Sequence, residues 1–192
     1  MATRAPERPD QQGDGSDHAI QIVPMRRRHL RAVLRIEAQV YPRPWSLSLF
    51  LSELALRGSR SYYVARSEGL VVGYGGLMFT GQDAHVTTLA VDPAMHRRRI
   101  GTSLLHTLAH DARRAGSRNL TLEVRMTNAD AQELYAKFGF RSAGVRKKYY
   151  IETNEDALVM WAEGIDTPDY AARLARLAQT APATVEWGRD RR

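Results

Sequence analysis

Apolar residues in the first part of the chain recur at helical spacing, and prolines mark where the helices end. Residues 26–41 place leucine and valine side chains on one side of a predicted helix. That helix should end before Pro42 and Pro44, because proline lacks the amide hydrogen that a continuing helix needs. Ser46 is a suitable N-cap for a second helix, which is expected to end before Gly58.

Two further helices are predicted later in the chain, and strands precede, separate and follow them. Residues 100–112 carry a continuous apolar face that ends at Gly116, and a helix capped by Asn128 ends at Gly139. Strands are predicted at residues 20–23, 61–66, 70–79, 84–91 and 119–125, with a closing pair at 141–151 and 157–162. This alternation predicts an α/β protein in which helices cover the faces of a sheet.

The two ends of the chain differ from the centre in composition. Residues 1–18 hold no large apolar side chain after Met1, so we expect a disordered N-terminal tail. Residues 19–164 should form one domain. Residues 165–192 are expected to be a C-terminal tail, with a short amphipathic helix after Pro168.

Composition narrows the classes of protein that fit. Of the 192 residues 43% are hydrophobic, which is enough for the core of one domain. The chain has no cysteine, which excludes disulfides, cysteine-ligated metals and thiolate nucleophiles. The six histidines show no metal-ligand spacing, so we expect no metal site. Neither a membrane-spanning apolar run nor a secretory signal is visible, so we expect a cytoplasmic protein.

The charge is strongly basic, at +7 from 28 Lys and Arg against 21 Asp and Glu. A nucleic-acid-binding protein, an enzyme with an anionic cofactor or a ribosomal partner, and a protein with an ordinary basic surface all fit this charge.

A basic turn at residues 91–102 joins a predicted strand to a predicted helix. Helix N-termini leave backbone N–H groups unpaired, and such groups bind anions. Arg97, Arg98 and Arg99 add positive charge there, which predicts a phosphate or pyrophosphate ligand; a solvated basic turn is the alternative. The turn has neither the Gly-Lys-Ser/Thr of a Walker loop nor the glycine spacing of a dinucleotide-binding loop.

The turn resembles the coenzyme A loop of the GNAT superfamily of acetyltransferases, which follows the pattern V-x-P-x-x-Q-x-x-G-x-G/A. The matching residues are Val91, Pro93, Ile100 and Gly101. His96 stands where the family has glutamine, and Arg99 stands where it has its first glycine. That glycine lets the backbone approach the pyrophosphate closely, so Arg99 must either tolerate the same backbone geometry or change how the loop binds.

Residues 120–140 resemble the GNAT motif L-x-L-E-V-R-x-x-N-x-x-A-x-x-L-Y-x-x-x-G-F nearly residue for residue. Residues 41–46 and 146–150 resemble two segments of the RimI branch, whose members acetylate the N-terminal alanine of small-subunit ribosomal protein eighteen. The resemblance covers about residues 20–163. It implies the GNAT fold, with a central mixed, mostly antiparallel sheet and helices on both faces.

The resemblance also implies a reaction. The acetyl group of acetyl-CoA would move to the α-amine of a protein N-terminus, directly within a ternary complex, because no cysteine is present to carry it. One alternative is a GNAT enzyme that acetylates protein lysines or small amines. Another is a non-catalytic basic module that binds ribosomes or RNA. The implied partner is a protein N-terminus, with neither DNA nor a membrane involved.

The resemblance gives two residues catalytic roles. Glu123 lies on the strand face opposite Leu122 and Val124, and would be the general base. The alternative is a surface carboxylate paired with Arg125 or another base. Tyr135 would protonate the leaving thiolate, whereas its position on an apolar helix face alone predicts a core tyrosine.

Further residues would bind the two substrates. The backbone of residues 89–91 would hold the pantetheine arm as an added strand, and Asn128 would contact the cofactor as well as cap its helix. The predicted cofactor-binding residues are Leu89, Ala90, Val91, Arg97, Arg98, Arg99, Ile100, Gly101, Thr102 and Asn128. Trp45, Tyr149 and Tyr150 would line the peptide pocket, with core packing as the alternative.

Overall fold

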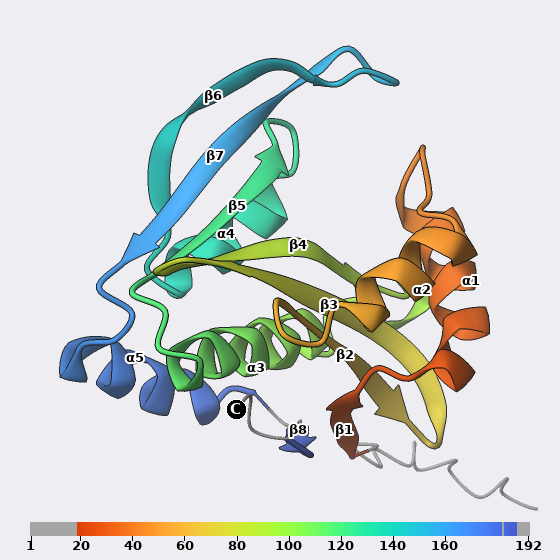
Figure 1. Cartoon of the computed structure of the whole chain (residues 1–192), viewed down its shortest axis with the longest axis horizontal. Helices are drawn as coiled ribbons and strands as arrows, with labels where there is room; N and C mark the ends of the chain where they lie inside the picture. Colours follow the sequence, from red (N-terminus) through yellow and green to blue (C-terminus); the bar gives the residue numbers. More distant parts are fainter. Residues whose placement is uncertain (1–18, 182, 188–192) are drawn as a thin grey trace, which may run out of the picture.

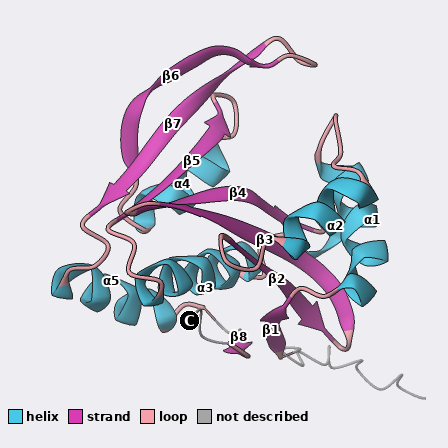
Figure 2. Ribbon diagram, viewed as in Figure 1, coloured by secondary structure: helices cyan, strands magenta, loops and turns pink. Residues whose placement is uncertain are grey.

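The computed structural model describes residues 19–181 and 183–187, and the strands within them form one mixed sheet (Figures 1 and 2). The strands are β1 (Ile20–Pro24), β2 (Arg60–Ser67), β3 (Leu70–Thr80), β4 (Asp83–Val91), β5 (Asn119–Arg125), β6 (Arg141–Tyr150), β7 (Glu155–Glu163) and β8 (Ala183–Val185). Their order across the sheet is β6-β7-β5-β4-β3-β2-β1-β8. Neighbouring strands are antiparallel, except that β4 runs parallel to β5 and β1 runs parallel to β8. The predicted mixed, mostly antiparallel sheet is confirmed.

Helices cover both faces of the sheet (Figure 1). They are α1 (Leu30–Val40), α2 (Leu47–Ala55), α3 (Ile100–Arg114), α4 (Ala129–Lys137) and α5 (Pro168–Ala178). Side chains alternate between the two faces along a strand, and β2 shows the result. Tyr62 and Val64 join the core under α1 and α2, whereas Tyr63 and Ala65 join the core under α3, α4 and α5.

The connection between α1 and α2 follows the signals in the sequence. Helix α1 ends at Val40, before Pro42, as predicted. Ser46 is the N-cap of α2, and its hydroxyl accepts the backbone N–H of Leu49 at 3.2 Å. The loop between the two helices is therefore fixed at both ends.

The predicted start of the first helix at residue 26 is wrong. Arg27–His29 form a 3₁₀ turn, and α1 begins only at Leu30. The imidazole of His29 is buried, and its Nδ1 accepts the backbone N–H of Arg26 at 3.1 Å. This local side-chain bond tightens the turn, which the apolar spacing alone does not reveal.

The segment after residue 164 packs onto the domain, although the sequence suggested a tail. Helix α5 occupies the stretch after Pro168, and its buried Tyr170 and Leu174 join the core under α3. Strand β8 then pairs in parallel with β1 at the edge of the sheet. The predicted tail at residues 1–18 lies outside the described residues. Within the described residues, no helix has the length and apolar character needed to cross a membrane.

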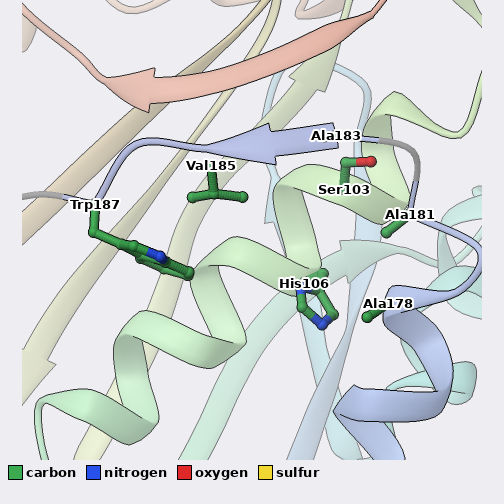
Figure 3. A pocket seen from close by; sticks show the side chains of 7 residues that line it. All are labelled: Ser103, His106, Ala178, Ala181, Ala183, Val185 and Trp187. Atoms are coloured by element: carbon green, nitrogen blue, oxygen red, sulfur yellow. The ribbon is translucent and has the colours of Figure 1, made fainter.

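A small pocket of about 120 Å³ lies between α3, α5 and β8 (Figure 3). It is lined by Ser103, His106, Ala178, Ala181, Ala183, Val185 and Trp187. His106 Nε2 lies 3.1 Å from the carbonyl oxygen of Leu174, and the indole of Trp187 packs on His110 with ring centroids 4.6 Å apart. These contacts join the C-terminal segment to α3. None of the residues predicted for the site lines this pocket.

Candidate active site

The candidate site lies where β4 and β5 stop pairing with each other. The two parallel strands are in register at residues 83–85 and 119–121. Beyond this point β4 remains paired with β3 and β5 with β7, so the facing edges of β4 and β5 diverge (Figure 1). Backbone N–H and C=O groups on such edges need other partners. The split between β4 and β5, called the opening below, therefore presents backbone edges to which a ligand can bind as an extra strand.

Leu89, Ala90 and Val91 form the last part of β4, beside this opening. The carbonyl of Leu89 accepts a hydrogen bond from the Tyr41 hydroxyl at 3.0 Å, and the carbonyl oxygen of Val91 lies 3.2 Å from His96 Nε2. Alternate residues of a strand direct their backbone groups to the same side. Leu89 and Val91 therefore share a backbone direction toward the opening, as the predicted strand-like binding requires.

The predicted pyrophosphate loop leads into α3 with an unusual backbone. Arg97 and Arg99 have φ angles of 62° and 58°, in the left-handed region that favours glycine. Arg99 is the N-cap of α3, and the first turn of this helix holds no acidic residue. An arginine thus adopts a glycine-like backbone conformation here, at a cost of about 1 kcal/mol.

The loop presents positive charge to solvent and anchors itself in the core. All three of its arginine side chains are exposed, whereas Ile100 is buried. Gly101 and Thr102 are half-buried in the first turn of α3. A Cβ atom on Gly101 would lie 3.5 Å from Leu134 Cδ2, so this turn packs against α4. The N-terminus of α3 therefore combines unpaired backbone N–H groups with guanidinium groups, and both kinds of group bind anions.

Asn128 sits at the start of α4 and acts as its N-cap. Its Oδ1 accepts the backbone N–H of Ala131 at 3.2 Å, and the residue is exposed. The helix-capping function is therefore observed. A cofactor contact by the same side chain stays a prediction.

Glu123 occupies the middle of β5, on the face opposite its two neighbours. Leu122 and Val124 are buried in the core under α3 and α4. The side chain of Glu123 is only 9% exposed, so its carboxylate is largely removed from water. This placement on the second face is the one predicted from alternation along the strand.

Two basic side chains, those of His85 and Arg146, contact the carboxylate of Glu123. His85 Nε2 of β4 lies 3.1 Å from Oε2, and an Arg146 nitrogen of β6 lies 3.2 Å from Oε1. The hydrogen bond from His85 is the main reason why the pKa of Glu123 lies below its usual value; burial opposes it, and the charges of His85 and Arg146 reinforce it. Arg125 does not pair with Glu123, because it binds Glu155 at 2.8 Å. The carboxylate is ionised at neutral pH.

Tyr135 lies on the inner face of α4 and is 8% exposed. Its ring packs against Phe140 with centroids 5.7 Å apart. Burial raises the pKa of Tyr135 well above its usual value, and the nearby phenols of Tyr41 and Tyr150 act in the same direction. The phenol is therefore fully protonated at neutral pH, as a proton donor must be. Tyr135 is thus the core residue that its helix position predicted, and its role as the proton donor stays a prediction.

Trp45 follows the loop between α1 and α2. Its indole packs against Phe50 with ring centroids 5.3 Å apart, and its backbone N–H donates to Glu37 Oε1 at 2.9 Å. The ring is half-buried. One side of the indole therefore packs in the core, and the rest of the ring is exposed, so that a ligand can contact it.

Tyr149 and Tyr150 stand at the end of β6, with ring centroids 5.2 Å apart in an edge-to-face arrangement. Tyr149 is 45% exposed, and the guanidinium of Arg125 lies 4.0 Å from the ring centroid of Tyr150. The turn that follows reaches the α1–α2 loop, because Arg43 and Glu152 form an ion pair of 3.3 Å. This pair connects the two predicted walls of the peptide pocket.

Sequence reasoning missed three residues that contact the site. His85 carried no motif, Glu37 looked like one more helix residue, and Tyr41 was noted only within the proline-containing loop. His85 and Tyr41 take part through remote partners, Thr121 at 36 residues and Leu89 at 48 residues along the chain, whereas Glu37 contacts Trp45 only eight residues away. Within the part of the chain that the structure describes, no cluster of three or more His, Cys, Asp or Glu could hold a metal ion.

A sequence profile of the acetyltransferase (GNAT) family matches residues 30–140, which is more than half of the chain. The protein therefore belongs to the acetyltransferase (GNAT) family. The fold and the enzyme class predicted from the two motifs are both confirmed.

Its relatives include N-alpha-acetyltransferase RimI of Mycobacterium tuberculosis, 39% identical over 132 residues that cover 65% of this chain and 80% of that protein. The ribosomal protein bS18-alanine N-acetyltransferase of Escherichia coli K12 is 33% identical over 134 residues, which cover 68% of this chain and 88% of that protein. The crystal structure of ribosomal-protein-S18-alanine N-acetyltransferase from Escherichia coli matches with a TM-score of 0.69 and 29% identity. That match covers 76% of this chain and 94% of the other.

Proposed function

We propose that this protein transfers the acetyl group of acetyl-CoA to the α-amine of a protein N-terminus, and that the alanine at the N-terminus of ribosomal protein bS18 is its substrate. The relatives from Escherichia coli and Mycobacterium tuberculosis carry names that state this chemistry. The observation that carries the proposal is the position of Glu123. Its ionised carboxylate stands on β5, beside the opening between β4 and β5.

The residues around the opening fit acetyl-CoA. At Leu89 and Val91 the edge of β4 is not paired with β5, and its carbonyls contact the side chains of Tyr41 and His96; this edge suits the extended, amide-containing pantetheine arm. The exposed arginines and the N-terminus of α3 suit a pyrophosphate. Bound there, acetyl-CoA would supply an acetyl thioester: the amine would form a bond to the acetyl carbonyl carbon, the C–S bond would break, and coenzyme A would leave as the free thiol. The absence of cysteine supports direct transfer to the amine.

Glu123 and Tyr135 provide the two proton transfers in this proposal. Glu123 accepts a proton from the substrate ammonium, directly or through a water molecule, and so frees the nitrogen lone pair. Tyr135 donates its phenolic proton to the departing sulfur. Its neutral state at neutral pH supports this direction of transfer.

The substrate amine should be an α-amine rather than a lysine side chain. An α-ammonium has a pKa of about 7.7–8.0, so roughly a tenth of it is already neutral at pH 7; for lysine, with a pKa of about 10.4, the fraction is a few parts in ten thousand. One carboxylate with a low pKa is therefore better matched to an α-amine. Trp45, Tyr149 and Tyr150 would surround the first residue, and aromatic walls favour a small side chain there.

Peptide acetylation tests this proposal directly. The protein is incubated with acetyl-CoA and with peptides that begin with Ala, Ser or Met, beside a lysine peptide whose N-terminus is blocked. Mass spectrometry identifies the acetylated nitrogen. We expect fast modification of the Ala α-amine, slower modification of Ser and little of the lysine. Equal or faster acetylation of the blocked lysine peptide would replace this proposal with a lysine acetyltransferase.

A further inference from the structure

A chain of three polar side chains runs across the junction of β4 and β5. His85 and Thr121 are direct neighbours in the register of the two strands, and His85 Nδ1 lies 2.8 Å from Thr121 Oγ1. The other ring nitrogen of His85, Nε2, lies 3.1 Å from Glu123 Oε2. Thr121 and Glu123 are two residues apart on β5 and therefore share one face of the sheet.

For a neutral imidazole, the hydrogen-bonding capacities of the three groups define one arrangement. A carboxylate only accepts hydrogen bonds, so His85 must donate to Glu123 through a proton on Nε2. Nδ1 of a neutral imidazole then accepts, and the hydroxyl of Thr121 is the donor. Thr121 is 9% exposed, so little water competes for this bond. The acceptor-only carboxylate thus selects the imidazole form with a proton on Nε2, and the bond to Thr121 holds the ring at Nδ1.

The two oxygens of Glu123 consequently have different partners. Oε1 faces Arg146 on a flexible side chain that is 57% exposed, whereas Oε2 faces an imidazole held at both nitrogens. The other titratable groups coupled to Glu123 among the described residues are Tyr149 and Tyr150 of β6. Of these partners, only His85 is fixed by the strand junction at which the opening begins.

We infer that His85 is a positioning residue, which Thr121 holds in place at Nδ1 so that its Nε2–H orients the Glu123 carboxylate toward the substrate amine. The inference rests on the proposed role of Glu123 as the base. A hydrogen bond at Oε2 restricts the rotation of the carboxylate and so holds both of its oxygens in one orientation. Misplacing a reacting group by about 1 Å costs on the order of 100-fold in rate.

Two substitutions at His85 separate this role from simple packing. His85→Ala removes the donor, and we expect kcat to fall by about 10–100-fold with little change in the KM for acetyl-CoA. Loss of the donor also raises the pKa of Glu123, so the low-pH decline of kcat/KM should move to higher pH. His85→Gln keeps an N–H donor near the position of Nε2. It should restore both kcat, to within a few-fold, and the original pH profile.

Further variants provide the controls. Thr121→Val keeps the shape of the side chain but removes the hydroxyl; we expect a several-fold lower kcat, and this variant serves if His85→Ala does not fold. His106→Gln, in the pocket beside α5, should leave kcat unchanged. The inference is overturned if His85→Ala keeps the wild-type kcat and pH profile, if His85→Gln is as impaired as His85→Ala, or if Thr121→Val is fully active. Glu123→Gln separates the two proposals. Full activity of that variant would show that Glu123 is not the base, which contradicts the proposed function and not only the role of His85.

Discussion

A guanidinium nitrogen of Arg146 lies 3.2 Å from Oε1 of Glu123, so the carboxylate proposed as the base stands beside a permanent positive charge. The two residues come from β5 and β6, which are separated in the sheet by β7. The hydrogen bond from His85 is the main reason why the pKa of this carboxylate is low, and the positive charge of Arg146 lowers it further. Such a base suits a substrate amine that loses its proton easily.

Replacing the carboxylate tests this assignment. Glu123→Gln keeps the shape of the side chain but cannot accept a proton, so kcat should fall by about 10²–10⁴-fold at pH 7. The loss should shrink at higher pH, where more of the amine is already neutral. Steady-state rates across pH values, with coenzyme A affinity measured by calorimetry as a control, check this expectation. Full activity at pH 7 would show that Glu123 is not the base.

The left-handed backbone at Arg99 leads to a prediction about the cofactor loop. Arg99→Gly should keep acetyl-CoA binding within a few-fold, because glycine adopts this conformation without strain. Arg99→Val should lower the free energy of unfolding by about 1–2 kcal/mol, since a β-branched residue is strained there. Arg98→Gly removes one charge at a neighbouring position that lacks a positive φ, and serves as the matched control. If calorimetry shows that Arg99→Gly alone abolishes binding, the guanidinium itself is the ligand.

The indole of Trp45 should affect the peptide and not the cofactor. Trp45→Ala removes one predicted wall of the peptide pocket, and we expect the KM for the Ala peptide to rise about 10-fold or more. Acetyl-CoA binding should change little, because the cofactor uses β4 and the loop before α3. Trp45→Phe keeps an aromatic ring against Phe50 and controls for lost packing. An unchanged peptide KM in the Ala variant would exclude Trp45 from the pocket.

Glu37 should make the stability of the protein depend on pH. Burial raises its pKa from 4.5 to about 7, and the hydrogen bond from Trp45 only partly offsets this. A group with a raised pKa in the folded state stabilises the fold fully below its unfolded pKa, and this contribution is lost as the pH rises through about 7. Glu37→Gln is neutral throughout and keeps an acceptor for the Trp45 N–H.

The variant and the wild type should therefore be similarly stable near pH 4.5 and differ at pH 8. At pH 8, Glu37→Gln should be the more stable by up to about 3 kcal/mol, at 1.36 kcal/mol per pKa unit. Urea unfolding at both pH values measures the difference. A difference that is the same at both pH values would mean that Glu37 is not protonated in the folded protein.

Local patterns in the sequence were enough to predict the element order and the face on which Glu123 lies. Helix ends were marked by Pro42 and Ser46, and alternation along β5 placed Glu123 opposite Leu122 and Val124. These features depend on residues that are close together in the sequence, so the sequence alone is enough to predict them. The match to the GNAT motif then supplied the arrangement of the sheet.

The partners of the site residues could not be predicted, because they depend on how distant strands pair. His85 meets Glu123 only because β4 and β5 lie side by side with residues 85 and 121 in register. The ion pair of Arg43 with Glu152 likewise depends on the approach of two loops that are 109 residues apart. Strand β8 is three residues long and carries no distinctive pattern, so its pairing with β1 was not foreseen.

The position of β8 affects how the sheet can associate with other chains, because β8 covers one of its two edges. An unpaired border strand offers a row of backbone donors and acceptors on which a foreign strand can assemble. Strand β8 covers the edge of the sheet at β1. The opposite edge strand, β6, pairs with β7 through register shifts and carries adjacent lysines at 147 and 148. A chain that ended before Ala183 would lose the protection of the first edge only. Its β1 strand would become available for intermolecular sheet growth, so that solubility, rather than catalysis, would be the first property to fail.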